Sequence, residues 1–350
     1  MDAPLVSIVV RSTARPTLAA ALASVGAQTH PAVEAVVVAA SGSSHPTPPP
    51  ATGAHPVRFV ASAVPLSRPQ AANAGVDAAR GEWITFLDDD DAIDPTHVAG
   101  LVAATRGGRY HAVASLARVR MADGSVQNWG QPFALTELYV RNFLHLSTVL
   151  FARSLVDAGC RFDEAFDIMQ DWDYFLQIAQ HGPFHSTGLR SFEWHADVGS
   201  SGAGGGANED PARFARYRDL IYAKWSGARA TLIARIEPLL QQAGAALAAG
   251  DDARAEAAAE AVLAVARNEP NALAMLAAVE DRRGRRDDAV ALMSLAATVC
   301  PREARFLVGL ARLVLARGER QRAARLAEHA LALSPGDAAA AQLLASLRVP

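Results

Sequence analysis

Residues 83–91 read WITFLDDDD, an apolar run that ends in four consecutive aspartates. The apolar part, Trp83–Leu87, predicts a buried strand. Ligands of open α/β sheets bind beyond the carboxyl ends of the strands, so Asp88–Asp91 lie where a site is expected. Adjacent carboxylates repel one another unless they are solvated or hold a cation, and their oxygens suit Mg²⁺ or Mn²⁺. The alternative is a solvated acidic turn ahead of a helix near Pro95, although Asp94 alone would cap that helix.

The rest of the N-terminal part, to about residue 195, alternates short β-rich runs with helical patterns. Strands are predicted over Leu5–Val10, Ala35–Val38 and Val57–Ala61, and a helix over Gln70–Ala79. Strands separated by helices predict βαβ units, and therefore an α/β domain with a mostly parallel sheet.

The bulk composition bounds the possible classes of protein. A chain of 350 residues is too long for one small core and predicts two domains. Its net charge of −3 gives no reason to expect a nucleic-acid partner. Cys160 and Cys300 lie too far apart for a disulfide framework or a zinc site, which predicts a reducing compartment. Because no leader-like or membrane-spanning run is present, we expect a cytoplasmic protein, and docking on the inner face of a membrane remains compatible.

A different pattern begins beyond about residue 230, where Ala, Leu, Arg and Glu dominate. Three features recur at intervals of 34 residues: Gly250, Gly284 and Gly318; Ala255, Ala289 and Ala323; Pro301 and Pro335. This period resembles that of tetratricopeptide helix–turn–helix repeats over residues 237–350, with each Gly at a turn between paired helices. The resemblance implies a stack that binds a protein partner or presents an acceptor along a concave face. The alternative is an unrelated Ala-rich helical bundle.

Five motifs follow one another along the N-terminal part: Val6–Val10 with Ala23–Thr29, Arg68–Gly75 before Ala79–Ile84, Leu87–Asp91, Gly159–Glu164 and Gln170–Asp173. Their order resembles glycosyltransferase family 2 over about residues 1–200. The resemblance implies a GT-A type domain with a mostly parallel central sheet at residues 1–226. An all-α helical-repeat domain then follows at residues 237–350.

The resemblance also implies a reaction, the inverting transfer of a sugar from a nucleotide-diphosphate donor to an acceptor hydroxyl. The acceptor would be a sugar, a lipid-linked molecule or a protein. A divalent cation, Mn²⁺ or Mg²⁺, would neutralise the diphosphate leaving group. By position, Asp90 is the direct metal ligand, and Asp88 reaches the ribose or a metal-bound water. Asp171 occupies the position of the general base that takes the acceptor's proton.

Further residues are expected on the donor side. Arg68 suits a phosphate group because its guanidinium offers paired hydrogen bonds, and a helix beginning near Pro69 would add a favourable dipole. The alternative for Arg68 is an exposed salt bridge. Asn73 and Asp89 are also expected to bind the donor, and Asn73 is a candidate for holding the loop behind the acidic strand.

Three later residues complete the expected site. Trp172 and Asp173 are expected to bind the acceptor; Trp172 and Tyr174 are alternatively core residues of a helix, and we favour the core for at least one. His195 is a candidate third metal ligand, because it ends a possible strand before the Gly-rich segment 199–206. The alternative for His195 is a surface or packed histidine.

Two departures from the family pattern leave other functions open. Residues 38–42 read VAASG and lack the acid that contacts the nucleobase in many family members, so backbone groups or Ser41 would have to replace it. Gln170 stands where a Glu is usual. The main alternative is a non-catalytic platform made of a degenerate transferase domain and protein-binding repeats. A nucleotidyltransferase would want a Gly-rich loop after the first strand, which Arg11–Pro16 does not provide.

Overall fold

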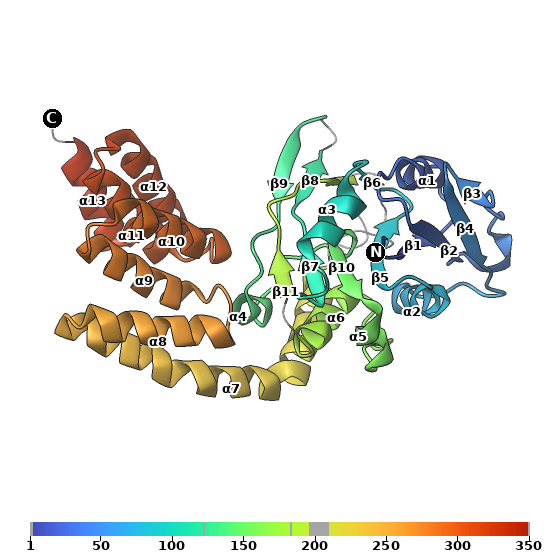
Figure 1. The fold of residues 1–350 in the computed structure, drawn as a ribbon. Coiled ribbons are helices and arrows are strands. Elements are labelled where there is room, and N and C mark those ends of the chain that lie inside the picture. Colours follow the sequence, from blue (N-terminus) through green and yellow to red (C-terminus); the bar gives the residue numbers. More distant parts are fainter. Residues whose placement is uncertain (1–2, 122, 183, 196–209, 349–350) are drawn as a thin grey trace. The chain divides into compact units, whose positions relative to one another are not determined.

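The computed structural model describes residues 3–121, 123–182, 184–195 and 210–348 (Figure 1). The chain divides into two units, of which the first combines Met1–Gln131 with Asn142–Trp225. The second combines Pro132–Arg141 with Ser226–Pro350. A single helix, α7 (Pro211–Ala249), runs through the interval that the sequence predicts as the domain boundary.

The first unit contains an eight-stranded sheet with the order β11-β7-β10-β5-β1-β2-β4-β3. Its strands are β1 (Val6–Ser12), β2 (Val33–Ala39), β3 (Ala51–Thr52), β4 (His55–Val60), β5 (Trp83–Asp88), β7 (Ala112–Ala114), β10 (Val149–Ala152) and β11 (Phe184–Ser186). The pairs β1–β2, β1–β5, β2–β4 and β7–β11 are parallel, whereas β10 is antiparallel to both of its neighbours and β3 is antiparallel to β4. The predicted α/β fold with a mostly parallel sheet is confirmed.

Helices of the first unit are α1 (Leu18–Gly26), α2 (Arg68–Ala78), α3 (His97–Ala104), α5 (Arg153–Asp157) and α6 (Gln170–Ala179). The start of α2 is fixed by a capping box, in which Ser67 accepts from the Gln70 amide and Gln70 accepts in return. Gly75 lets α2 pack closely on β1, because a Cβ at this position would lie 2.2 Å from Val9 Cγ1. The motif around Arg68–Gly75 thus sets both where the helix begins and how it lies on the sheet.

A smaller sheet, in the order β6-β12-β8-β9, extends the first unit. It consists of β6 (Ala92–Ile93), β8 (Ala117–Arg120), β9 (Val126–Trp129) and β12 (Phe192–His195). Because β6 directly follows the aspartate run and pairs with β12, this sheet brings His195 to the end of β5. The strand expected to end at His195 is confirmed, whereas the sheet that contains it was not predicted. The segment 199–206 lies outside the described residues.

Helices of the second unit follow the predicted repeat (Figure 1). After the short α4 (Leu135–Leu138) and α7 come α8 (Asp252–Val265), α9 (Pro270–Arg282), α10 (Arg286–Val299), α11 (Ala304–Ala316), α12 (Arg320–Leu333) and α13 (Ala338–Arg348). The helices α8, α10 and α12 begin at 252, 286 and 320, which are steps of 34 residues. Gly250, Gly284 and Gly318 adopt φ of +76°, +79° and +84° in the turns before these helices, a conformation that Gly adopts without strain. The predicted tetratricopeptide-like arrangement is confirmed.

Two other features bear on the sequence predictions. Cys160 and Cys300 are both free and buried. Within the part of the chain that the structure describes, no helix has the length and apolarity needed to cross a bilayer.

Candidate active site

The four aspartates after β5 differ in how open they are. The side chains of Asp88 and Asp90 are 29% and 13% exposed, whereas the side chain of Asp89 is 0% exposed. Asp91 is also buried, at 4%. The run therefore supplies two partly open carboxylates, spaced two residues apart, and two buried ones.

Asp88 is held by an arginine on the neighbouring strand. The register of β1 on β5 pairs Arg11 with Asp88, and Nη2 of Arg11 donates to the two carboxylate oxygens at 2.6 and 2.9 Å. Burial alone would raise the pKa of Asp88, but the charges of Arg11, His145 and Arg68, with the Arg11 hydrogen bonds, hold it below its ordinary value. Asp88 is therefore ionised and fixed in orientation.

Asp89 anchors the loop between β1 and α1. Its carboxylate accepts from the Ser12 hydroxyl at 2.8 Å, the Thr13 amide at 2.9 Å and Arg15 Nη1 at 2.6 Å. With no exposed surface and three donors, Asp89 shapes the site from behind. The expectation that it binds the donor stays a prediction, but its side chain is not open to a ligand in this structure.

Asp90 and Asp91 meet His195 from β12. The His195 amide donates to Asp91 Oδ1 at 3.0 Å, and its ring Nδ1 lies 2.7 Å from the Asp90 carbonyl oxygen. The other ring nitrogen lies 3.0 Å from Glu193 Oε1. His195 thus reaches the acidic run, as expected of a metal ligand, but a metal would have to displace one of these contacts. Its role as a ligand stays a prediction.

Burial and mutual repulsion disfavour charge on the last two aspartates. Burial, and then the charge of Asp88, raise the pKa of Asp90, while Arg15 opposes this from 3.2 Å. The same two causes raise the pKa of Asp91 to about 8, with the His195 amide opposing them. A divalent cation at Asp90 would relieve this repulsion.

Asp171 stands in the first turn of α6, where the helix dipole favours a carboxylate. Met169 precedes the helix with a φ of +61°, a left-handed conformation that is strained for a residue with a side chain. Oδ1 of Asp171 accepts from the Trp172 amide at 2.9 Å, and Oδ2 accepts from Asn142 Nδ2 at 3.1 Å. Burial raises its pKa, and the Trp172 amide and the charge of Arg11 oppose this.

Arg68 connects the two acidic regions. It is the first residue of α2 and is partly buried. Burial, and then the charge of Arg11, lower its pKa, whereas the charges of Asp88 and Asp171 raise it. Its guanidinium makes no hydrogen bond or ion pair with any described residue. The charges of Asp88 and Asp171, which are far apart in the sequence, therefore both favour the charged form of Arg68.

Asn73 has a structural contact. Its side-chain amide donates to the Phe162 carbonyl at 2.9 Å and accepts from the Phe162 amide at 3.0 Å. This pair of bonds holds the Gly159–Glu164 turn against α2, and the expected role in holding the loop behind the acidic strand stays a prediction. Binding of the donor by Asn73 stays untested.

Both residues expected to bind the acceptor are buried. Trp172 is 3% exposed and lies edge-on to Tyr222, 5.9 Å between ring centroids. Asp173 is 0% exposed and accepts from Lys224 at 2.9 Å and Trp225 at 2.8 Å. The core alternative is thus confirmed for Trp172, and also for Tyr174, which is fully buried. An acceptor role for Trp172 or Asp173 would need a change from this packing.

Sequence reasoning missed several residues of the site, above all Arg11, Arg15, Asn142 and His145. The parallel pairing of the first and fourth predicted strands was the only available signal, because it sets Arg11 opposite Asp88. At the nucleobase position, the Ser41 hydroxyl is buried and has no hydrogen-bond partner among the described residues.

The first unit has the α/β fold with a mostly parallel sheet that the resemblance to a GT-A type domain implies. Residues 7–162 match the family model for Glycosyl transferase family 2, so this part of the chain is similar to the domains of that family. No curated protein matches the chain.

Solved structures with some similarity include S. aureus TarS 1–349, at 12% identity and a TM-score of 0.45 over 98% of this chain and 90% of that one. A mutant of the Thermobaculum terrenum O-GlcNAc transferase gives 29% identity and a TM-score of 0.32 over 33% of this chain, which spans 22% of the transferase. The Sgt2 TPR domain from Aspergillus fumigatus gives 19% identity and a TM-score of 0.31 over 32% of this chain and 76% of that one. Since these scores are low, strand order and the family match carry the description of the fold.

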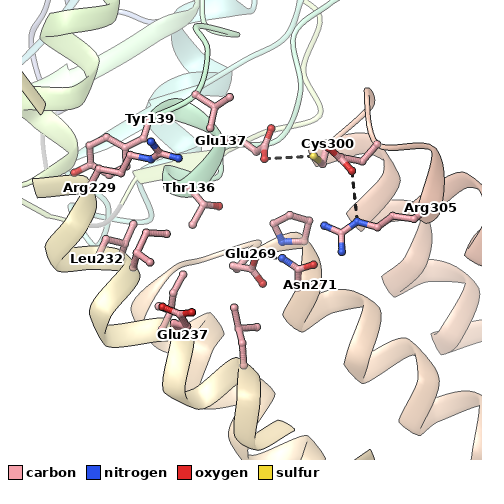
Figure 2. Close-up of a pocket in the computed structure, with 16 residues that line it drawn as sticks. Thr136, Glu137, Tyr139, Arg229, Leu232, Glu237, Glu269, Asn271, Cys300 and Arg305 are labelled. Atoms are coloured by element: carbon pink, nitrogen blue, oxygen red, sulfur yellow. Dashed lines mark hydrogen bonds and ion pairs between the residues drawn. The ribbon is translucent and has the colours of Figure 1, made fainter. Parts of the chain in front are cut away.

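The second unit has a cavity of its own, of about 300 Å³ (Figure 2). It is lined by α4, the second half of α7, the start of α9 and the turn before α11. Leu232 and Ile236 give it an apolar side, and the Cys300 thiol donates to Glu137 Oε1 at 3.3 Å on its wall. Burial, and then the charge of Glu137, raise the pKa of Cys300 to about 12, so the thiol stays protonated. None of the lining residues belongs to the acidic site.

Proposed function

We propose that this protein is an inverting, metal-assisted glycosyltransferase that moves a sugar from a nucleotide-diphosphate donor to an acceptor hydroxyl. The observation that carries the proposal is Arg68, an arginine without a polar partner among the described residues that interacts with both Asp88 and Asp171. A diphosphate bound by Arg68 would lie within range of the charges of both the acidic run and the base. Arginine is well suited to this role, because its fork matches phosphate oxygens.

The residues fit a divalent cation at Asp90. The described residues contain no group of three or more His, Cys, Asp or Glu side chains arranged to hold a metal. Mg²⁺ and similar ions commonly take one or two carboxylates from the protein and further oxygens from substrate phosphates, which is what Asp90 and Asp88 offer. When bound, such a cation offsets the charge that develops on the diphosphate leaving group.

Asp171 is proposed as the general base. Its raised pKa makes it a better proton acceptor than an exposed aspartate, and Asn142 and the Trp172 amide hold its carboxylate in place. The acceptor oxygen bonds to the anomeric carbon while its proton passes to Asp171 and the bond to the diphosphate oxygen breaks. A single displacement of this kind inverts the anomeric centre and needs no covalent nucleophile.

The donor is proposed to be a nucleotide sugar. Because one similar structure is a complex of S. aureus TarS with UDP-GlcNAc, UDP-sugars are the first donors to test. Ser41, whose buried hydroxyl is unsatisfied, is a candidate contact for the base in the absence of an acid at residues 38–42.

A second candidate function is a non-catalytic platform that recruits a protein partner through its repeats. The lack of the nucleobase-contacting acid and the two occupied ring nitrogens of His195 favour it. The cavity of the second unit would then belong to the binding surface.

A screen of nucleotide sugars separates the two candidates. The full-length protein is incubated with each donor and Mn²⁺, and release of the nucleoside diphosphate is followed, with Asp171→Asn as the control for base catalysis. If the transferase proposal is correct, the wild type hydrolyses at least one donor and Asp171→Asn does not. If no donor is hydrolysed and no nucleotide raises the thermal stability, the platform is favoured.

A further inference from the structure

Four aromatic side chains form a cluster on one face of the smaller sheet; we call Trp129, His145, Phe192 and Trp194 the aromatic platform. The ring of His145 stacks on Phe192 with 4.6 Å between centroids and lies 5.3 Å from Trp194. The two tryptophans meet edge to face at 6.0 Å. Such spacings are those of favourable aromatic pairs, so the rings support one another.

The platform is buried at one end and open at the other. Strand pairing sets Phe192 beside Ala117 and Trp129, so these side chains share a face, and alternation puts Trp194 and Gln127 on the same face. Phe192 is fully buried, whereas Trp129, His145 and Trp194 remain partly exposed. Gln127 is exposed and adds an amide beside the rings.

His145 and strand β12 relate the platform to the acidic run. His145 lies close enough to Asp88 to interact with its charge. His195, the neighbour of Trp194 on β12, lies 2.7 Å from the Asp90 carbonyl oxygen through its ring. Alternation along β12 directs the Trp194 and His195 side chains to opposite faces of the sheet, so the platform adjoins the acidic run through His145 and through the backbone of β12.

We propose that the aromatic platform binds a pyranose ring of the acceptor. This proposal rests on the proposed transferase function and names the class of its acceptor as a carbohydrate. The C–H face of a pyranose is apolar and packs on an aromatic face, while its hydroxyls need polar groups at the edge. The indole N–H groups, the imidazole and the Gln127 amide supply such groups. Trp129 and Trp194 thus take the role that Trp172 is too buried to fill.

The test measures binding of the full-length protein to an array of immobilised pyranose-containing glycans. Wild type is compared with Trp129→Ala, Trp194→Ala and Trp129→Phe, and with Val126→Ala as the control on the opposite face of β9. The platform predicts that the wild type binds at least one glycan and that each Ala variant binds it roughly tenfold more weakly. Trp129→Phe, which keeps a ring, and Val126→Ala are expected to bind nearly as well as the wild type.

Several outcomes would overturn the platform. The first is that the wild type binds no glycan. The second is that both Ala variants bind as tightly as the wild type. The third is that Val126→Ala loses as much affinity as the Ala variants of the platform. Thermal unfolding of each variant identifies a loss caused by misfolding. In that case Gln127→Ala, at an exposed position on the same face, decides, and unchanged glycan binding by this variant overturns the platform. Nucleotide-sugar hydrolysis is measured separately on the same samples. Hydrolysis with unchanged glycan binding by the Ala variants removes the platform alone, whereas absence of hydrolysis removes the transferase proposal.

Discussion

The end of β5 and the start of α6 both carry aspartates spaced two residues apart. In both regions some of these side chains are partly open and others are enclosed by hydrogen-bond partners. In the β5 run, Asp88 and Asp90 stay partly open while Asp89 is enclosed by Ser12, Thr13 and Arg15. On α6, Asp171 is partly open, while Asp173 is enclosed by partners that include Lys224, the only lysine of the chain. In each region one set of carboxylates is bound into the structure and another is available for chemistry.

The comparison teaches that sequence spacing marks where acids gather, and burial decides what each acid can do. A buried aspartate that accepts from several donors is closed to a ligand, whereas a partly open one beside a cation is accessible. The following substitutions separate the open aspartates from the enclosed ones.

The largest effect is expected for Asp171→Asn. Loss of a general base should lower the rate of sugar transfer roughly 100- to 10,000-fold, with little change in donor affinity. Steady-state kinetics with the donor found by the screen measure the rate, and calorimetry measures the affinity. Transfer at the wild-type rate would assign the base elsewhere, with Asp173 and Glu164 as the next acids to substitute.

A smaller effect is expected for Asp90→Ala. Removal of the proposed metal ligand should weaken Mn²⁺-dependent binding of the nucleoside diphosphate roughly 10- to 100-fold, comparable to the effect of perturbing other metal sites. Binding without Mn²⁺ should hardly change. Calorimetric titrations with and without Mn²⁺ test this, and an unaltered Mn²⁺ effect would take Asp90 out of the site.

Asp173→Asn should act on stability instead. The substitution leaves Lys224 without its buried partner, and we expect the free energy of unfolding to fall by about 1–3 kcal/mol. The fall is limited because the lysine keeps access to solvent. Mn²⁺-dependent nucleotide binding by the folded variant should match the wild type. Urea unfolding and the calorimetric titration measure the two properties. A normal stability with a lost nucleotide affinity would instead make Asp173 a ligand-binding residue.

The smallest effect is expected for Asp91→Asn, and it depends on pH. The folded-state pKa of Asp91 is raised to about 8 from an ordinary 3.8, so the folded protein holds a proton that the unfolded chain releases. Asp91 therefore makes stability fall as pH rises from about 4 to 8, because the folded state binds more protons in this window. Asn removes this penalty, and without metal the variant should melt at a higher temperature than the wild type at pH 8 but not at pH 4. The exposed Asp77→Asn is the control, and an equal gain at both pH values would contradict the assignment.

Local sequence patterns predicted those parts of the molecule that depend on neighbours in the chain. The acidic run after Leu87, the start of α2 near Pro69 and the glycine turns of the repeats each follow from a short segment. Local physics is enough there, because an apolar strand, a capping box and a left-handed turn are set by a few adjacent residues.

The remainder depends on contacts between distant residues and was not predicted. Arg11 meets Asp88 across 77 positions and Asn142 meets Asp171 across 29, and no local pattern encodes either pair. The segment Pro132–Arg141, which lies in the sequence between strands of the first unit, belongs to the second. The burial of Trp172 likewise follows from packing against α7, which composition alone does not reveal.

Anomalous diffraction at the manganese edge tests the central claim most directly. Crystals of the full-length protein grown with Mn²⁺ and the nucleoside diphosphate of the hydrolysed donor would locate the ion without reference to its surroundings. We predict an anomalous peak in direct coordination with Asp90, with the diphosphate between it and Arg68 and with Asp171 facing the same space. A diphosphate-bound ion away from Asp90, or one with Asp171 turned away from the diphosphate, would contradict the account.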